Sequence, residues 1–244
     1  MSLIREALAH VQGFLIEPAP AGATRDPDPL APEHREGTEL LDGEIARRRQ
    51  VPSLDVVVLG LSGGCGVTTL ARGLAASLSI PGERPAQLLI AGETETTSPS
   101  ERVKGTVPTW RLPPRLSDPA AVADHGEMVA RLAGRPSALV WDVAAGEAGT
   151  VEVVAARADA VVLVAGRECT PALAEIVRSM VRQRYRRVVL AANRITDSSR
   201  WNGRCDVCVP ESRLGAMLIA RGWRPGSAMG GALAKLAALV EPEV

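Results

Sequence analysis

The sequence predicts a doubly wound α/β domain in which helices flank a mostly parallel sheet. From residue 54 onward, short apolar stretches alternate with helical ones. Residues 160–164 (Ala-Val-Val-Leu-Val) are apolar at every position, which is typical of a parallel strand buried on both faces. Strands that alternate with helices in this way form an α/β sheet. The expected strands are 55–60, 87–91, 107–112, 138–142, 160–165, 187–192 and 205–209.

The composition restricts both the core and the partners. Hydrophobic residues make up 46% of the 244 residues but aromatic ones only 2%, so we expect a core of Ala, Val and Leu. Twenty-eight basic residues balance 28 acidic ones. The protein therefore has no global field that would attract nucleic acid or an acidic membrane, and any such contact must be local.

The chain divides into three predicted parts. Residues 1–16 form an amphipathic helix, because Ile4, Leu8, Val11 and Leu15 recur at helical spacing. Residues 17–53 form a linker, rich in Pro, Ala and Gly at its start, followed by a polar segment. Residues 54–244 form the α/β domain. The linker lets the N-terminal helix reach a protein partner, and the alternative is that this helix folds back onto the domain.

A glycine-rich turn follows the first predicted strand and precedes a helix. Residues 61–70 (Leu-Ser-Gly-Gly-Cys-Gly-Val-Thr-Thr-Leu) hold three glycines within four positions. Such a turn directs successive backbone N–H groups toward an anion, and the start of the helix adds a partial positive charge. Glycine turns between a strand and a helix are also common without any ligand, so the turn alone leaves both interpretations open.

Several stretches resemble the ParA/MinD family of P-loop NTPases, and they occur in the family's order. Residues 62–68 resemble its deviant Walker A loop, in which a signature lysine, two glycines, a variable residue, glycine, lysine and threonine follow one another. Residues 138–146 resemble the Walker B strand and its turn. Further blocks of the family are similar to 88–93, 158–164, 188–194 and 209–212. The resemblance covers most of residues 54–240 and implies binding of ATP or ADP with Mg²⁺.

Both lysines of the family's loop are missing here. Ser62 stands at the signature lysine and Val67 at the P-loop lysine, and the chain has only two lysines, Lys104 and Lys235. A cation about 4 Å from a phosphate oxygen contributes on the order of 4 kcal/mol at an effective dielectric constant near 20. Because phosphoryl transfer depends on positioning and charge stabilisation, we expect weak nucleotide binding and little hydrolysis.

The resemblance also implies individual site residues. The hydroxyl of Thr68, and Asp142 through a bound water, would hold Mg²⁺. Asn193 would contact adenine, and Pro210 lies in the loop beside the base. Ala91 and Glu93 replace the two acids of the family's switch segment, which leaves Glu93 as the catalytic candidate. The residues expected to surround the nucleotide in the loop are Gly63, Gly64, Cys65, Gly66, Val67, Thr68 and Thr69.

Three functional interpretations remain open. The favoured one is a nucleotide-binding scaffold or positioning factor with little or no ATP hydrolysis, in cell division, pilus or secretion assembly. The second is an active ATPase with a non-lysine charge source, and the third is a loop without a ligand. In the family's dimer the signature lysine contacts the other subunit's nucleotide. With Ser62 at that position we expect a homodimer that does not depend on nucleotide, with Arg102 or Arg115 as the alternative source of charge.

The cysteines allow further expectations. Cys65 lies at a helix start, where the dipole favours a reactive thiolate, but a small structural side chain is the favoured interpretation. Cys205 and Cys208 form a lone C-x-x-C without further zinc ligands. Residues three apart in a strand point to opposite faces, so we expect two unrelated core thiols. A site completed by a second subunit is the alternative.

Five arginines, at 178, 182, 184, 186 and 187, crowd into a stretch without acidic residues. They could contact phosphates or acidic lipids, although a solvated helix end facing acidic residues elsewhere is favoured. Residues 231–240 hold only one basic residue, so we expect core packing there rather than a membrane-binding tail. No secretory signal or membrane span is recognised, and we expect a cytoplasmic protein that a partner recruits to the membrane or cell pole.

Overall fold

The computed structural model describes residues 54–79, 86–91, 107–111, 124, 138–143 and 148–242. The predicted N-terminal helix and linker lie outside these residues, as do Glu93, Arg102 and Arg115. The helices among the described residues include none that is long and apolar enough to cross a membrane.

A seven-stranded sheet in the order β3-β2-β4-β1-β5-β6-β7 forms the centre of the domain. Every neighbouring pair is parallel, which confirms the predicted fold class. The runs expected to form strands do so, with small differences at their ends. The strands are β1 (Leu54–Gly60), β2 (Ala86–Ala91), β3 (Thr109–Arg111), β4 (Ala138–Val143), β5 (Ala160–Ala165), β6 (Val188–Ile195) and β7 (Val207–Pro210).

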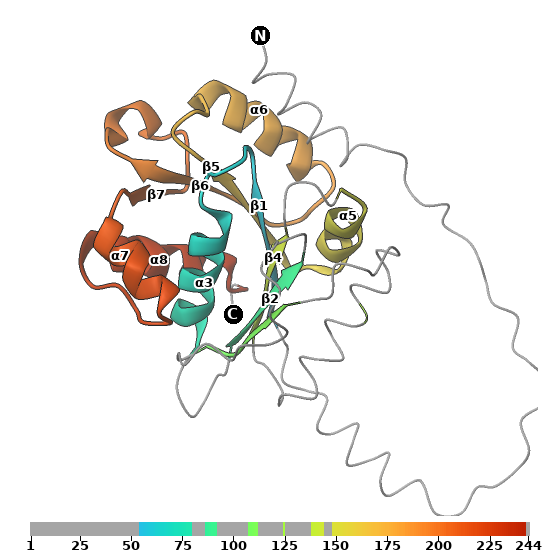
Figure 1. Ribbon diagram of the computed structural model, residues 1–244. Coiled ribbons are helices and arrows are strands. Elements are labelled where there is room, and N and C mark those ends of the chain that lie inside the picture. The colour runs from blue at the N-terminus through green and yellow to red at the C-terminus, as the bar shows by residue number, and fades with distance from the viewer. Residues whose placement is uncertain are drawn as a thin grey trace, which may run out of the picture. The chain divides into compact units, whose positions relative to one another are not determined.

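Helices cover both faces of the sheet (Figure 1). On one face α3 (Val67–Leu78), α7 (Arg213–Ala220) and α8 (Ser227–Val240) bury their apolar side chains. On the other face α5 (Ala148–Arg157) and α6 (Pro171–Arg182) do the same. A short 3-10 helix, η1 (Ser198–Trp201), precedes β7.

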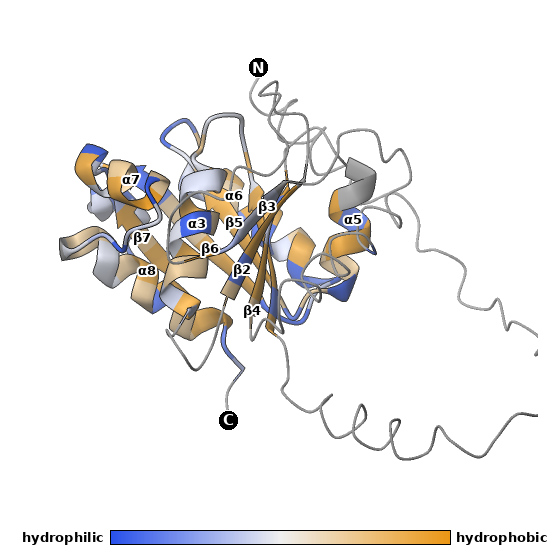
Figure 2. Cartoon of the chain, turned by 60° about the horizontal axis from the view of Figure 1, so that its bottom comes forward, coloured by the Kyte–Doolittle hydropathy of each residue, from blue (hydrophilic) through white to orange (hydrophobic). Residues whose placement is uncertain are grey.

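Small aliphatic side chains build the core, as the composition predicts. The strands β4 and β5 are buried along their whole length, and Figure 2 shows the central strands as predominantly hydrophobic. Gly73 lets α3 approach α8 closely, because a Cβ at this position would lie 2.7 Å from Leu233 Cδ1. Leu233 and Leu236 of α8 are fully buried, which confirms that the C-terminal helix packs in the core.

The last strand starts later than the sequence suggests. A bend at Asp206 precedes β7, and the Asp206 carboxylate accepts hydrogen bonds from Leu190 N at 2.8 Å and from Arg178 Nη2 at 2.7 Å. The bend turns Cys205 back toward Cys208, and their Sγ atoms lie 3.1 Å apart. The expectation of two unrelated thiols on opposite faces is therefore wrong, because it assumed a straight strand from Arg204 to Pro210.

Because all seven strands are parallel, their carboxyl ends meet at one edge of the sheet. The glycine-rich loop follows β1, the central strand, and runs directly into α3. The ends of β4, β5 and β6 lie along the same edge. In open α/β sheets this edge is where ligands bind, beside the strand at which the strand order changes direction.

Candidate phosphate-binding site

The loop between β1 and α3 has the backbone of an anion cradle. Gly64 and Gly66 adopt left-handed conformations, with φ angles of 68° and 90°. Gly66 is the N-cap of α3, and no side chain caps this helix start. Gly63 and Gly64 are exposed, and a Cβ on either would meet nothing within 4 Å. The loop therefore presents backbone groups to open space next to the positive end of a helix dipole.

Cys65 and Val67 point away from that open space, toward the end of β1. A Cβ on Gly60 would lie 2.7 Å from both Cys65 Sγ and Val67 Cγ2. Val67 is half-buried and packs against the apolar cluster shared by β1 and α3. The residue at the position of the P-loop lysine thus contributes to the core and brings no charge to the loop.

The thiol of Cys65 is embedded rather than reactive. Its side chain is 3% exposed and contacts Gly166 as well as Gly60. Burial raises the pKa of the Cys65 thiol, although hydrogen bonds with backbone groups of the loop oppose the rise. The structural interpretation of Cys65 is the one that this environment supports, because a buried thiol with a raised pKa forms little thiolate.

Asn193, at the end of β6, holds the loop from the neighbouring part of the sheet. Its Nδ2 donates to Cys65 O at 2.8 Å, and its Oδ1 accepts from Arg194 N at 2.9 Å. The side chain is 3% exposed, and a Cβ on Gly66 would lie 2.3 Å from Nδ2. Only glycine at position 66 leaves room for this clamp. Contact of Asn193 with adenine stays a prediction.

Arg194 is a cation at the loop that the sequence analysis did not identify. Its Nη1 donates to Gly64 O at 3.2 Å, and its backbone has a φ angle of 58°, unusual for a residue with a side chain. Arg167 Nε contacts Arg194 O at 3.4 Å and its guanidinium pairs with Glu211. Pro210 ends β7, one residue before Glu211. The sequence did place Arg194 directly after Asn193, a predicted site residue, and this was the available signal. The contact of Arg194 with the loop itself depends on the fold.

Thr68 and Asp142 come together from α3 and β4. Asp142 is 3% exposed, and burial raises the pKa of its carboxyl, while a hydrogen bond with Thr68 and the charge of Arg72 oppose the rise. Its Oδ2 has no hydrogen-bond partner in the described part of the chain. A carboxylate oxygen without a partner beside a threonine hydroxyl fits the oxygen ligands that Mg²⁺ prefers.

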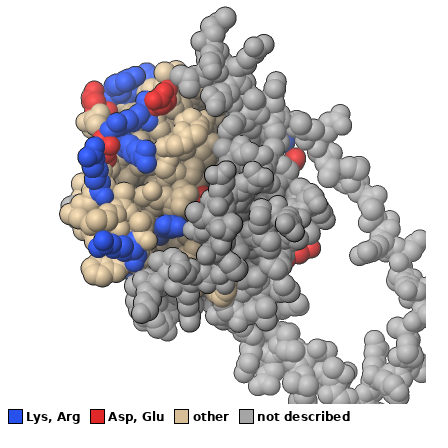
Figure 3. Space-filling model, in the orientation of Figure 1, with Lys and Arg blue, Asp and Glu red and all other residues tan. Residues whose placement is uncertain are grey.

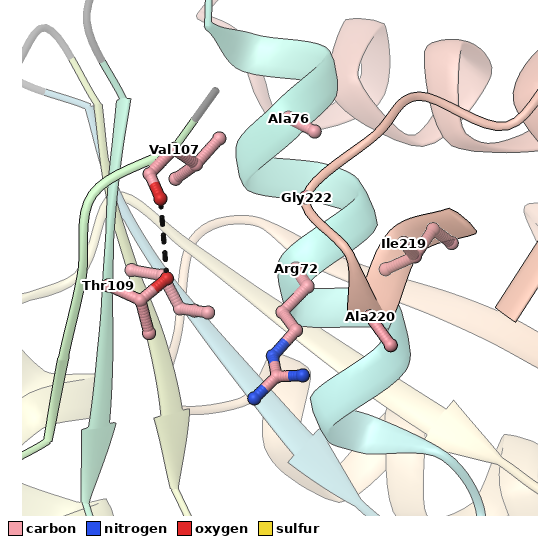
Figure 4. Close-up of a pocket in the computed structure, with 8 residues that line it drawn as sticks. Arg72, Ala76, Val107, Thr109, Ile219, Ala220 and Gly222 are labelled. Atoms are coloured by element: carbon pink, nitrogen blue, oxygen red, sulfur yellow. Dashed lines mark hydrogen bonds between the residues drawn. The ribbon is translucent and has the colours of Figure 1, made fainter. Parts of the chain in front are cut away.

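Arg72 also lines a small pocket between α3, β2, β3 and α7 (Figure 4). The cavity volume is about 20 Å³, enough for a water molecule and far too small for a nucleotide. Its other walls include Ala76, Leu88, Val107 and Ile219. Among the described residues we find no cluster of three or more His, Cys, Asp or Glu side chains that could hold a metal ion by themselves.

Three of the five arginines around α6 contact other parts of the domain, whereas Arg182 and Arg186 are exposed. Arg178 is 8% exposed and pairs with Asp206 and Glu175, and Arg184 lies 3.8 Å from Glu152. Arg187 donates to backbone carbonyls at the end of α8. Figure 3 shows basic and acidic side chains interspersed on the upper left of the described surface, around β7. These contacts favour the interpretation in which the end of α6 faces acidic residues over the one in which it forms a free basic patch.

Comparison with known proteins adds evidence at the level of the fold. No family model matches the sequence, and no curated protein matches it either. Among solved structures, a ParA family ATPase from Chlorobium tepidum TLS aligns with a TM-score of 0.57 at 14% identity, covering 76% of this chain and 99% of that one.

Two MinD structures give similar alignments. The MinC:MinD cell division protein complex of Aquifex aeolicus aligns at a TM-score of 0.53 and 18% identity, covering 76% of this chain and 94% of that one. The septum site-determining protein MinD of Pyrococcus horikoshii OT3, complexed with Mg-ADP, aligns at a TM-score of 0.51 and 14% identity. This alignment covers 78% of this chain and 96% of that one. The fold is therefore that of the ParA/MinD P-loop ATPases.

Proposed function

We propose that this protein binds a Mg-nucleotide at the loop formed by residues 62–69 and hydrolyses it slowly or not at all. The observation that carries the proposal is the contrast within one loop. Gly63, Gly64 and the uncapped start of α3 offer the geometry of a phosphate cradle, whereas Val67 is turned into the core. In this proposal the loop backbone keeps the shape that binds phosphates, whereas the lysine charge that would support hydrolysis is missing.

Backbone geometry and charge affect binding and turnover differently. N–H groups and a helix dipole stabilise the ground-state phosphates. Hydrolysis needs additional positive charge where negative charge develops in the transition state, and each missing cation removes on the order of 4 kcal/mol at an effective dielectric constant near 20. Turnover should therefore fall by several powers of ten while weak binding remains.

For the metal, Thr68 and Asp142 are the residues that would hold Mg²⁺, with Asp142 acting through a bound water. When bound, Mg²⁺ would neutralise charge on the phosphate oxygens. The two side chains already lie together, and Asp142 Oδ2, which has no hydrogen-bond partner among the described residues, can accept from a metal-bound water without breaking an existing hydrogen bond. Arg72 adds a positive charge on the same side of α3.

One observation favours an active ATPase as the second candidate. Arg194 places its guanidinium on Gly64 O, so a cation does lie at the loop despite the missing lysines. Its present hydrogen bond goes to a loop carbonyl rather than into the cradle, and the side chain would have to leave that bond to contact a phosphate. We therefore rank this candidate below binding without turnover.

At the level of the cell, we propose a scaffold or positioning role exerted through protein partners, in cell division, pilus or secretion assembly. One structural neighbour is MinD in complex with MinC, a cell division protein complex. In the proposed role this chain would report its position through such a partner rather than through a cycle of hydrolysis. Recruitment to a membrane or cell pole would follow from the partner.

Calorimetric titration of the full chain with Mg-ATP, followed by an assay of phosphate release, tests the proposal. We expect binding that is weak but measurable at millimolar ATP, with phosphate release far below about one per second, the low end of typical enzymes. The absence of any binding heat at millimolar ATP would refute the binding half. Release at about one per second or faster would refute the other half and favour Arg194 as the charge source.

Restoring the lost charge tests the assignment of the loop. Val67→Lys, preferably combined with Ser62→Lys, should tighten ATP binding tenfold or more, because a charged lysine would leave the apolar contact that Val67 makes at the end of β1 and extend toward the phosphates. Val67→Met is the matched control, since it lengthens the side chain similarly without charge. Equal affinities for the lysine and methionine variants would show that the loop does not cradle phosphates as proposed.

A further inference from the structure

Cys205 and Cys208 lie together at the outer edge of the sheet, away from the loop after β1. β7 is the terminal strand of the sheet that the described residues form, next to β6, and both cysteines are half-buried. Their Sγ atoms are 3.1 Å apart. A disulfide bond requires about 2.05 Å, so about 1 Å of movement separates the two thiols from bonding distance.

The surrounding structure holds this arrangement in place. Asp206, between the two cysteines, is fixed at its backbone by a hydrogen bond from its N to Leu190 O at 2.9 Å. Its carboxylate is fixed by Leu190 N and by Arg178, which is nearly buried. Cys205 Sγ also donates to Trp201 O at 3.7 Å. The bend that juxtaposes the thiols thus depends on contacts with β6 and α6 and does not need the disulfide to form.

We propose that Cys205 and Cys208 form a reversible intramolecular disulfide by exchange with low-molecular-weight disulfides of the glutathione type. The thiolate of Cys208 attacks one sulfur of the small disulfide, which releases one small thiolate and leaves a mixed disulfide on Cys208. The thiolate of Cys205 then attacks Cys208 Sγ, forms the protein disulfide and expels the second small thiolate. The two protein sulfurs are oxidised, the small disulfide is reduced, and the two thiol protons pass to the released thiolates.

The order of attack follows from the environment of Cys205. Burial, together with the neighbouring Cys208 and Asp206, raises the pKa of Cys205 to about 12. Ionisation of Cys205 would also give up the hydrogen bond that its thiol donates to Trp201 O, so Cys205 is the less suited of the two to open the exchange. Once Cys208 carries the mixed disulfide, its sulfur is the nearest electrophile to Cys205, and closure within the chain outcompetes a second small molecule because the two sulfurs are held in contact.

The other two cysteines provide an internal comparison. Cys65 and Cys169 are 3% and 8% exposed, and burial raises the pKa of Cys169 to about 11. Both are shielded from a small disulfide by the core and should remain thiols under the same conditions. The proposal does not rest on nucleotide binding, because β5 and β6 separate the dithiol at β7 from β1 and its loop, and neither cysteine belongs to that loop.

The test is exposure of the full chain to mixtures of oxidised and reduced glutathione, followed by acid quenching, alkylation under denaturing conditions and mass spectrometry. We expect the protein to lose two hydrogen atoms, both within the tryptic peptide 205–213, while the remaining two of its four thiols become alkylated. Reduction with excess glutathione should restore all four. Alkylation of all four thiols in strongly oxidising mixtures, or oxidation at Cys65 and Cys169 instead, would overturn the proposal.

Single variants test the order of attack. Cys205→Ser should accumulate a persistent glutathione adduct on Cys208, whereas Cys208→Ser should form its adduct at Cys205 at least tenfold more slowly. Circular dichroism shows whether each variant is folded. If a variant unfolds, the time course of the wild-type adduct, which should appear transiently on Cys208 and never on Cys205, gives the same information. A wild-type protein that stops at a stable adduct would contradict the proposal.

Discussion

Replacing Asp142 with asparagine should raise the thermal stability of the protein in the absence of metal. The carboxylate is 3% exposed and its Oδ2 has no hydrogen-bond partner among the described residues. A buried polar atom without a partner costs about 1–3 kcal/mol, and more when charged. Asparagine still places a polar atom at this position, so the expected gain comes from removing the charge. For a domain of this size each kcal/mol corresponds to about 2–4 °C, so we expect Asp142→Asn to melt at least about 2 °C higher in EDTA.

The pH dependence of this effect has a definite sign. Burial raises the pKa of Asp142, against the opposing influence of Thr68 and Arg72. A carboxyl whose pKa is higher in the folded than in the unfolded protein favours folding when protonated. That contribution is present below the unfolded pKa and is lost as pH rises through the folded value. The gain from Asp142→Asn should therefore be largest near neutral pH and shrink as pH falls toward the ordinary range of aspartate.

Differential scanning fluorimetry in EDTA and in Mg²⁺ with nucleotide measures both effects. Mg-nucleotide should raise the melting temperature of the wild type more than that of Asp142→Asn, because the neutral amide attracts the metal-bound water less strongly than the carboxylate does. Asp206→Asn is the matched control: its carboxylate accepts from Leu190 N and Arg178, so the same substitution should destabilise there. An Asp142→Asn protein that melts below the wild type in EDTA would refute the reasoning.

Two further predictions concern the loop clamp and assembly. Asn193→Ala removes one buried and one partly buried hydrogen bond and leaves Cys65 O without the Asn193 donor. It should therefore destabilise the protein by about 2 kcal/mol and speed amide hydrogen exchange in residues 64–66. Unchanged exchange there would mean that the clamp does not order the loop. Ser62 is too short to reach a facing subunit's nucleotide and carries no charge, so any homodimer should form without nucleotide. Light scattering should therefore give the same mass without nucleotide, with ADP and with a non-hydrolysable ATP analogue. A monomer that dimerises only with the analogue would contradict this.

The fold was predictable because its signal is local and repeated. A continuous apolar run such as 160–165 is typical of a strand that helices cover on both faces. The glycine-rich turn lies between the first strand and the following helix, which is where a doubly wound fold binds its ligand. The direction of Val67 was less accessible. Its contact with Gly60 depends on how α3 leaves the loop, which the spacing of glycines does not specify.

Two features of the molecule depend on contacts between distant parts of the chain and could not be predicted from sequence. Arg194 reaches Gly64, 130 positions away, only because β6 lies two strands from β1 in the sheet. The proximity of Cys205 and Cys208 depends on the bend at Asp206, which Arg178 and Leu190 stabilise from α6 and β6. In both cases the local sequence suggested a regular strand end.

The clamp at Asn193 explains how a loop without lysines could still bind a nucleotide. The loop is held by the Asn193 side chain and by Arg194, so its backbone is ordered by the protein itself and the entropy of ordering it need not be lost on binding. That saving helps the ground state, which needs shape and backbone donors. It does nothing for the transition state of phosphoryl transfer, which needs charge that Val67 and Ser62 cannot provide. If nucleotide binds here as we propose, we expect a preformed loop that lacks both lysines to separate binding from hydrolysis.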